Sequence, residues 1–541
     1  MLVPSGSLKR FILLLLACGI INAQDFDLIL QGGRIVDGME NPWYHAELGI
    51  RNGRIAAIGN LKDRAATQIV ALHGQTVTPG FIDMMAGSSI PLYRNSESAG
   101  SKLQQGITTM MAGEGGSDAP QGEHSKFPWR TFEQYFHLLE EHGVPLNVVH
   151  NVGAAQIRKI VIGDVDRPPT PEEMDRMKQL VGQAMIDGAV GLSTALIYPP
   201  GTYARTDELV EMAKVAAKYG GFYSTHMRNE SSKVLEAIGE SLEIGRRANI
   251  PVHIYHLKAA GEENWPLMQR AIDMIGKARA DGMDVTADIY PYIRNGLGLG
   301  SLIHPRHYAQ GSQAFLKTLN DPKVRHELRR EIEATSDWEN WYRHVGSNWD
   351  NVLVAQMPEG GDKKFEGKSI AEIAKMSGKD QWSAFFDLFQ SGDVSVNPKS
   401  MNEEQKHLAL RSEFISFCTD SEPIDIAKAT NAHPRAFGSF PRVLAKYVRE
   451  EKIITLEMAI RKMTSLPANR LKLYDRGRIA PGMAADLVIF DPNTIQDTAT
   501  FTKPLSFPTG ISYVLVNGKI AVDHGHQTAE LAGKLLRNSR R

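Results

Sequence analysis

The sequence predicts an α/β protein in which a TIM-like (β/α)8 barrel is joined to a small β-sandwich built from both ends of the chain. Two observations lead to this prediction. β-Branched runs separated by glycine turns occur near both termini, and the long segment between them alternates strand-like with helix-like runs. Tight turns between β-branched runs are typical of hairpins, whereas alternating β and α runs are typical of a parallel barrel.

Residues 1–23 are expected to be an export signal and not part of the fold. Two basic residues precede the apolar run FILLLLACGII (11–21), and Ala23 offers a small residue for cleavage. The run is shorter than the roughly 20 apolar residues that a membrane-spanning helix needs. Two alternatives stay open: a buried N-terminal helix, and a lipoprotein signal LLAC with lipidation of Cys18. We therefore expect an exported protein, periplasmic or extracellular, that is attached to a membrane only if Cys18 is lipidated.

The β-sandwich is predicted from residues 24–80 and 477–541. Its N-terminal part contains the runs FDLILQGGRIVDG, AELGIRNGRIAAIG and QIVALHGQTVTPG, and its C-terminal part contains GMAADLVIFD and GISYVLVNGKIAVDHG. An Asn-Gly pair between two β runs favours a two-residue hairpin turn. Two short β regions that enclose a long middle segment therefore predict one domain made from both ends.

The barrel is predicted from residues 81–476. Strand-like runs such as GITTMMAG, AVGLSTALIY, GFYSTHM, PVHIYHLK, DVTADIYPY and FISFCTD alternate there with helix-like runs such as TPEEMDRMKQLVGQAMIDG. Around residues 300–360 this pattern breaks into polar, aromatic-rich sequence, which we interpret as an insertion over the barrel mouth. In a βα barrel the catalytic groups lie where strands end and loops begin.

Overall charge argues against two kinds of partner. Lys and Arg together number 61 against 62 Asp and Glu, so the net charge is -1. Such a balance gives no electrostatic reason to expect nucleic acid or an anionic membrane surface. The only cysteine besides Cys18 is Cys418, so a mature chain cut after Ala23 would have no intrachain disulfide. The oligomeric state is not predicted.

Two histidines stand at the ends of strand-like runs, where a barrel would present them at its mouth. His226 closes GGFYSTH, and His256 follows IPVHIY. Imidazoles that come from separate strands are common zinc ligands, although a single histidine in such a place is more often a plain polar residue. Two in like positions, about 30 residues apart, make metal ligation as well supported as the plain polar interpretation.

Two carboxylates occupy similar positions. Glu114 follows GITTMMAG and is flanked by glycines, which would let its backbone and carboxylate approach an ion closely. Asp420 ends FISFCTD, where a carboxylate is well placed for proton transfer. From the residues alone, Glu114 could equally be an exposed loop residue and Asp420 a helix cap.

Longer motifs resemble those of the amidohydrolase superfamily and, within it, of the N-acyl-D-amino-acid deacylases (D-aminoacylases). The resemblance runs from about Asp27 to the end of the chain. Its most specific segments are GLSTALIYPPGTYARTDEL, YSTHMRNE, HLKAAG, DIYPY, HPRAFGSFPRVLAKYVREE, AIRKMTSLPANRL and DRGRIAPGMAADLVIFDP. The family implies a metal-bearing barrel of the amidohydrolase type with a β-sandwich made from both termini.

The resemblance also implies roles for individual residues. His226 and His256 match the two histidine ligands of the family's tightly held zinc, and Asp420 matches its catalytic aspartate. The substrate-binding positions correspond to Lys258 and Arg435, which would hold a carboxylate, and to the pocket tyrosines Tyr198 and Tyr290.

Two departures from the family concern the metal. The third ligand of the family is a cysteine in a Gly-Asn-Cys-Gly loop, whereas this loop offers only Glu114 as a metal ligand. The histidine pair of the family's second, weaker metal site is replaced by Met85 and Gly87. We therefore expect one tightly bound ion, Zn2+, held by Glu114, His226 and His256, with Mn2+ and Co2+ as alternatives because a carboxylate is a harder ligand than a thiolate.

The function implied is hydrolysis of the linear amide bond of N-acyl-D-amino acids by metal-activated water, with Asp420 as general base and then acid. The partner would be a small-molecule substrate with a free carboxylate. Alternatives are another amidohydrolase reaction, on peptides with a D-residue or on cyclic amides, and a non-catalytic binding homologue that lost its chemistry together with the histidine pair.

Overall fold

The β-domain is assembled from both ends of the chain. The computed structural model describes residues 25–309, 311–334 and 338–538, so the predicted export signal and Cys18 lie outside the described residues. A nine-stranded sheet has the order β21-β20-β19-β18-β5-β1-β2-β3, with β4 paired to β1. Its strands are β1 (Phe26–Ile35), β2 (Tyr44–Arg51), β3 (Arg54–Gly59), β4 (Ala66–Ala71), β5 (Thr76–Pro79), β18 (Leu487–Phe490), β19 (Ile511–Val516), β20 (Lys519–Asp523) and β21 (His526–Gln527).

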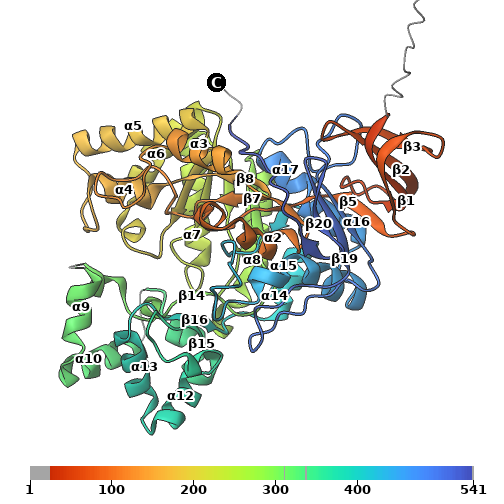
Figure 1. The fold of residues 1–541 in the computed structure, drawn as a ribbon. Helices are drawn as coiled ribbons and strands as arrows, with labels where there is room; N and C mark the ends of the chain where they lie inside the picture. Colours follow the sequence, from red (N-terminus) through yellow and green to blue (C-terminus); the bar gives the residue numbers. More distant parts are fainter. Residues whose placement is uncertain (1–24, 310, 335–337, 539–541) are drawn as a thin grey trace, which may run out of the picture.

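The two chain ends meet where β5 pairs antiparallel with β18, so that Pro79 lies opposite Leu487. The Asn-Gly pairs form tight turns: Asn52 and Gly53, between β2 and β3, have φ of 51° and 73°. Positive φ at both central residues is the requirement of a type I′ hairpin turn. In Figure 1 the first strands and β19 and β20 lie beside each other at one end of the molecule.

Eight parallel strand positions form the barrel. β6 pairs with β7 and β7 with β8, while β9, β10, β11, β12, β13 and β17 form a second run of neighbours. β8 and β9 are one strand interrupted at Asn151. The ranges are β6 (Phe81–Asp83), β7 (Ile107–Ala112), β8 (Asn147–His150), β9 (Val152–Gly153), β10 (Gly191–Ala195), β11 (Phe222–His226), β12 (Val252–Ile254), β13 (Val285–Ile289) and β17 (Ile415–Phe417).

Amphipathic helices surround the barrel and bury one face against it. They include α3 (Phe132–His142), α5 (Pro171–Asp187), α6 (Thr206–Lys218), α7 (Val234–Ala248), α8 (Leu267–Ala280), α14 (Glu403–Arg411) and α16 (Leu456–Met463). The start of α5 is set locally, because Thr170 and Glu173 form a capping box. Within the described ranges, none of the helices has the length and apolar composition needed to cross a membrane.

An insertion subdomain lies between β13 and β17. It contains β14 (Leu297–Gly298), α9 (Ser312–Thr318), α10 (Pro322–Glu333), α11 (Trp341–His344), β15 (Val352–Gln356), α12 (Ile370–Ser377), α13 (Gln381–Gln390) and β16 (Ser395–Pro398). Its strands form a separate sheet of order β14-β16-β15. It has its own aromatic core, in which Trp349 stacks on Phe385 with ring centroids 5.0 Å apart. The predicted insertion near 300–360 falls inside this segment, which continues to Pro398 and protrudes from the barrel in Figure 1.

Candidate active site

Three predicted metal ligands meet at the C-terminal ends of the barrel strands. Glu114 follows β7, His226 is the last residue of β11, and His256 comes shortly after β12. Oε1 of Glu114 lies 3.0 Å from Nδ1 of His226 and 3.2 Å from Nε2 of His256. The ligand atoms of all three lie within 4.8 Å of one another, and no other group of this kind occurs in the part of the chain that the structure describes.

The glycines around Glu114 aim its side chain. Gly113 and Gly115 have φ of 96° and 65°, a backbone region that disfavours other residues. A Cβ at Gly115 would lie 2.6 Å from the backbone nitrogen of Ala195, and one at Gly113 would lie 2.5 Å from the carbonyl oxygen of Asn151. Only glycine at these positions lets the loop fold tightly against its neighbours, and this fold directs Glu114 toward the histidines.

The electrostatics of this cluster fit a divalent cation. Burial opposes ionisation of Glu114, but hydrogen bonds with His226 and His256 outweigh it and hold the pKa of that carboxyl below its usual range. Burial and Lys258 act to lower the pKa of His256, yet the surrounding carboxylates outweigh them and raise it to about 10. The site therefore favours a positive charge between these groups. Two imidazoles and one carboxylate are also a known ligand set for catalytic zinc.

A further carboxylate, Glu230, lies next to both histidines on the side away from Glu114. Glu230 was not predicted from the sequence. Its oxygens lie 3.0 Å from Nδ1 of His256 and 3.4 Å from Nε2 of His226, the ring nitrogens that face away from Glu114. Nζ of Lys258 donates to both oxygens of Glu230, each at 2.7 Å. Burial opposes ionisation of Glu230, but the nearby positive charges keep the pKa of this carboxyl low. Its position four residues after His226 was the available signal.

Asp420 is presented at the same end of the barrel, shortly after β17. Its backbone lies in the left-handed region with φ of 49°, and its N–H donates to the carbonyl of Met85 at 3.0 Å. The carboxylate of Asp420 accepts a hydrogen bond from Nη1 of Arg435. Burial raises the pKa of Asp420, and Arg435 opposes the shift. A carboxyl group with a raised pKa is suited to move a proton near neutral pH.

Asp83, which ends β6, holds the turn that carries Asp420. Its carboxylate accepts hydrogen bonds from the backbone N–H of Thr419 at 2.9 Å and from Oγ1 of Thr419 at 2.6 Å. Nζ of Lys102 donates to Asp83 at 2.9 Å and to the carbonyl of Ser421 at 2.5 Å. Asp83 and Lys102 are fully buried, so this ion pair ties the first barrel strand to the last.

Each of the two predicted pocket tyrosines lies next to a different histidine of the metal-ligand set. Ring centroids are 5.4 Å apart for Tyr198 and His226, 4.5 Å for the two histidines, and 6.4 Å for His256 and Tyr290. The guanidinium of Arg435 lies 4.8 Å from the ring centre of Tyr290. Tyr198 therefore lies beside His226, whereas Tyr290 lies beside His256 and under the guanidinium of Arg435.

All eight predicted site residues line one cavity of about 260 Å³. Met85 and Gly87, at the positions of the missing histidine pair, line it as well. The insertion contributes Leu297 and Trp341 to the wall, which sequence reasoning did not assign to the site. Inside the protein, Lys258 and Arg435 already have carboxylate partners in Glu230 and Asp420, so a substrate carboxylate would share or displace these contacts.

Comparison with known proteins identifies the family. The curated D-aminoacylase of Alcaligenes xylosoxydans xylosoxydans is 32% identical over 530 residues, covering 95% of this chain and 98% of that protein. The N-acyl-D-glutamate deacylase of the same organism is 33% identical over 528 residues, covering 95% and 97%. The chain belongs to the D-aminoacylase family of amidohydrolases. The model of the amidohydrolase family also matches residues 360–522.

Solved structures agree with this result. A crystal structure of D-aminoacylase superposes with a TM-score of 0.79 at 29% identity, covering 95% of this chain and 100% of that one. The N-acyl-D-glutamate deacylase of Bordetella bronchiseptica, solved with zinc and a phosphonate mimic of the tetrahedral intermediate, has a TM-score of 0.80 at 30% identity, covering 95% and 99%. The family resemblance and the amidohydrolase-type barrel predicted from the sequence are confirmed. The chain is a metal-dependent amidohydrolase of this family.

Proposed function

We propose that the protein hydrolyses the amide bond of N-acyl-D-amino acids. The observation that carries the proposal is the convergence of a metal-ligand set, a carboxyl group and a guanidinium in one cavity: Glu114, His226 and His256 with Asp420 and Arg435. The D configuration and the acyl-amide substrate rest on the relatives, which are deacylases of D-amino acids.

The ion we propose is a single Zn2+, with Mn2+ and Co2+ as alternatives, held by Glu114, His226 and His256. The short distances between their ligand atoms and the preference of the cluster for positive charge support it. When bound, the ion supplies Lewis acidity to the amide carbonyl and to the attacking water. A single ion is proposed because Met85 and Gly87 offer no side chain that ligates a hard divalent cation at the second position.

Asp420 is the proton carrier in this proposal. It takes a proton from the attacking water, whose oxygen forms a bond to the acyl carbon, and returns that proton to the nitrogen as the C–N bond breaks. The products are a carboxylate and a free amino acid. Because Asp420 is paired with Arg435, the same contact fixes the carboxyl in position before the substrate arrives.

Arg435 is proposed to hold the α-carboxylate of the substrate, with Tyr290 beside it and Lys258 contributing charge. A guanidinium presents two parallel N–H groups that match a carboxylate, which a lysine does not. Cyclic amides have no α-carboxylate, so this arrangement favours linear N-acyl amino acids over the ring amides of the alternative hypothesis.

The test is turnover of a panel of N-acetyl-D-amino acids, their L-enantiomers and their amide-capped analogues by protein loaded with one equivalent of Zn2+. We expect hydrolysis of the D-series with a free carboxylate only. Preference for L-substrates or for capped substrates would overturn the proposal, and absence of turnover with metal bound would favour a binding homologue. Elemental analysis that returns two tightly bound ions per chain would overturn the single-ion assignment.

Glu114→Gln tests the third ligand directly. A neutral amide is a poor metal ligand, so we expect a sharp loss of zinc affinity, which Glu114→Cys should partly restore by supplying a soft donor. Unchanged metal content in Glu114→Gln would remove Glu114 from the site while leaving His226 and His256 in place.

We also propose export, on the strength of the N-terminal sequence alone. Expression of the full chain with cell fractionation should find the protein outside the cytoplasm, shortened after Ala23. Retention of an intact N-terminus in the cytoplasm would contradict export, and membrane attachment lost in Cys18→Ala would establish the lipoprotein alternative.

A further inference from the structure

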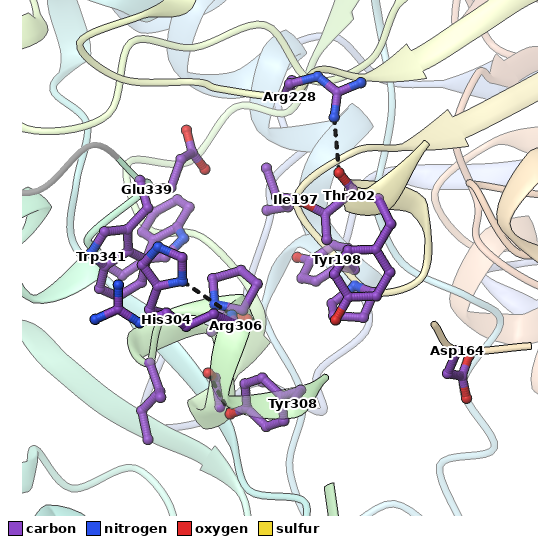
Figure 2. Close-up of a pocket in the computed structure, with 18 of the residues that line it drawn as sticks. Asp164, Ile197, Tyr198, Thr202, Arg228, His304, Arg306, Tyr308, Glu339 and Trp341 are labelled. Carbon is purple, nitrogen blue, oxygen red and sulfur yellow. Dashed lines mark hydrogen bonds between the residues drawn. The ribbon is translucent and has the colours of Figure 1, made fainter. Parts of the chain in front are cut away.

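A groove between the barrel mouth and the insertion subdomain adjoins the catalytic cavity. Its volume is about 1240 Å³, which exceeds the roughly 300–1,000 Å³ of typical small-molecule pockets. Figure 2 shows its two walls: Ile197, Tyr198, Thr202 and Arg228 from barrel loops face His304, Arg306, Glu339 and Trp341 from the insertion. Tyr198 and Trp341 line both the groove and the cavity, so the two spaces lie against each other at these side chains.

The layout of the site indicates which half of a substrate enters the groove. Tyr198 neighbours His226, whereas Tyr290 and Arg435 form a pair that neighbours the other histidine, His256. A substrate whose α-carboxylate is held at Arg435, with its amide at the histidines, directs its acyl group past Tyr198. The groove therefore extends the acyl side of the substrate, and an acetyl group would fill only its entrance.

The walls of the groove combine charged groups with apolar side chains such as those of Ile197, Leu299 and Ile303, a mixture that suits a peptide chain. Charged groups of both signs line it, among them Lys159, Arg205 and Arg306, and Asp164, Asp166 and Glu236. Glu339 and Tyr203 also line it, and each has one side-chain oxygen, Oε2 and Oη respectively, that is buried without a hydrogen-bond partner among the described residues. Buried polar atoms are normally paired, and each peptide unit supplies an N–H and a C=O, whereas a fatty acyl chain supplies neither.

The sheet of the insertion offers main-chain contacts at the same place. β14 is an edge strand of the β14-β16-β15 sheet, and its Gly298 is exposed in the groove wall. The free edge of a strand binds extended peptides through backbone hydrogen bonds. A chain leaving the cavity at Tyr198 therefore meets both side-chain and main-chain partners.

We propose that the acyl group of the preferred substrate is itself a peptide, so that the enzyme removes a C-terminal D-amino acid from chains of three or more residues. This inference rests on the proposed function and specifies its substrate. Water adds its oxygen to the carbonyl carbon of the penultimate residue, the C–N bond breaks, and the nitrogen of the D-residue takes a proton. The products are a shortened peptide with a new carboxylate and a free D-amino acid.

The first test is a length series on the zinc-loaded full chain. The D-residue preferred in the acetyl panel carries an acetyl, acetyl-Ala, acetyl-Ala-Ala or acetyl-Ala-Ala-Ala group, with a dodecanoyl derivative for comparison. We expect kcat/KM to rise at least about tenfold from the acetyl to the longest peptide, because remote binding energy is used in the transition state. A flat or falling series, or a dodecanoyl substrate that exceeds the peptides, would overturn the inference.

The second test obstructs the groove without touching the chemistry. Gly298 has φ of -70° and ψ of 142°, which any residue adopts, and a Cβ added there meets no heavy atom within 4 Å. We expect Gly298→Trp to abolish the gain from peptide length while N-acetyl substrates keep kcat/KM within about twofold. Gly298→Ala is the matched control and should leave the whole series unchanged. Equal losses on acetyl and peptide substrates, or no loss on peptides, would contradict the groove assignment.

The two proposals fail in different ways. No turnover of any substrate with metal bound would overturn the proposed function and this inference together. Turnover of acetyl substrates without a gain from length would overturn the inference alone. If Gly298→Trp does not fold, as judged by its circular dichroism, the inference is accepted or rejected on the length series measured with the unmodified enzyme.

Discussion

Glu230→Gln tests whether one buried carboxylate orients both histidine ligands. Glu230 lies 3.0 Å from Nδ1 of His256 and 3.4 Å from Nε2 of His226. It can therefore accept from the ring N–H of His256, while Nε2 of His226 lies near it without a hydrogen bond, and the opposite nitrogens of both rings, which face Glu114, stay free for a metal. Glutamine keeps the shape of the side chain but removes its charge. One end of it becomes a donor that cannot accept from an imidazole N–H or from Lys258.

The size of the effect follows from these contacts. Loss of a group that orients a metal-ligating histidine typically costs about 10–100-fold in metal affinity, or about 1.4–2.8 kcal/mol. Glu230 contacts both histidines and also neutralises Lys258, whose Nζ lies 2.7 Å from each of its oxygens. We therefore expect a loss near the upper end of that range, together with a smaller loss in Lys258→Met.

The assay is competition for Zn2+ between the metal-free full chain and a chromogenic chelator. Glu208→Gln is the matched control, because Glu208 is also buried and also paired with a cation, Arg158, but stands on α6 away from the metal ligands. Both variants should lower the melting temperature, and only Glu230→Gln should weaken zinc binding. Equal zinc affinity in Glu230→Gln and the unmodified protein would refute the reasoning.

Three further predictions concern proton transfer, the ion pair beneath it and the pH dependence of stability. Asp420→Asn should lower kcat by about 10²–10⁴-fold with metal content unchanged; near-normal kcat would remove Asp420 from the mechanism. Lys102→Met leaves Asp83 buried without its cation, and urea unfolding should show a loss of about 3–5 kcal/mol, whereas an unchanged midpoint would contradict this. Burial lowers the pKa of Lys462 to about 7, against about 10.4 in the unfolded chain. At Lys462 the unfolded state therefore binds more protons between these values, so the contribution of this residue to the free energy of unfolding should rise with pH from about 7 to 10. Lys462→Met should flatten that rise, and an identical pH profile in both proteins would show that Lys462 is not the cause.

The regular parts of the fold were predictable because their signals are local. Asn52 and Gly53 specify their hairpin turn through backbone conformation alone, and the start of α5 is specified by the capping pair Thr170 and Glu173. The extent of the insertion was harder to predict, because its later elements α12 and α13 have the same amphipathic helical pattern as the barrel helices. Only their contacts with the core around Trp349 separate them from the barrel.

The candidate site likewise contains some residues that the sequence predicts and others that it does not. Residues that lie at or just after strand ends, such as His226 and Asp420, were predictable because a barrel brings all strand ends to one place. Lys102 and Glu339 contact groups far away in the sequence, and no local pattern predicts such contacts. For Glu230 the spacing from His226 was the one local signal, whereas its contacts with His256 and Lys258 were not predictable. The network that orients the ligands therefore became visible only in three dimensions.

The charges around the cavity link the metal centre to the choice of substrate. Four carboxyl groups and two permanent cations line it: Glu114, Glu230, Asp420 and Glu422 against Lys258 and Arg435. With all six ionised and both histidines neutral, as metal ligation requires, the cavity has two uncompensated negative charges. Burial raises the pKa of Asp420 and of Glu422. One divalent cation cancels this excess, whereas a second would leave the cavity strongly positive next to Met85 and Gly87, which cannot ligate it. The proposed single ion would thus bring the cavity close to neutrality, so that a substrate carboxylate could enter at Arg435 without facing a net negative field.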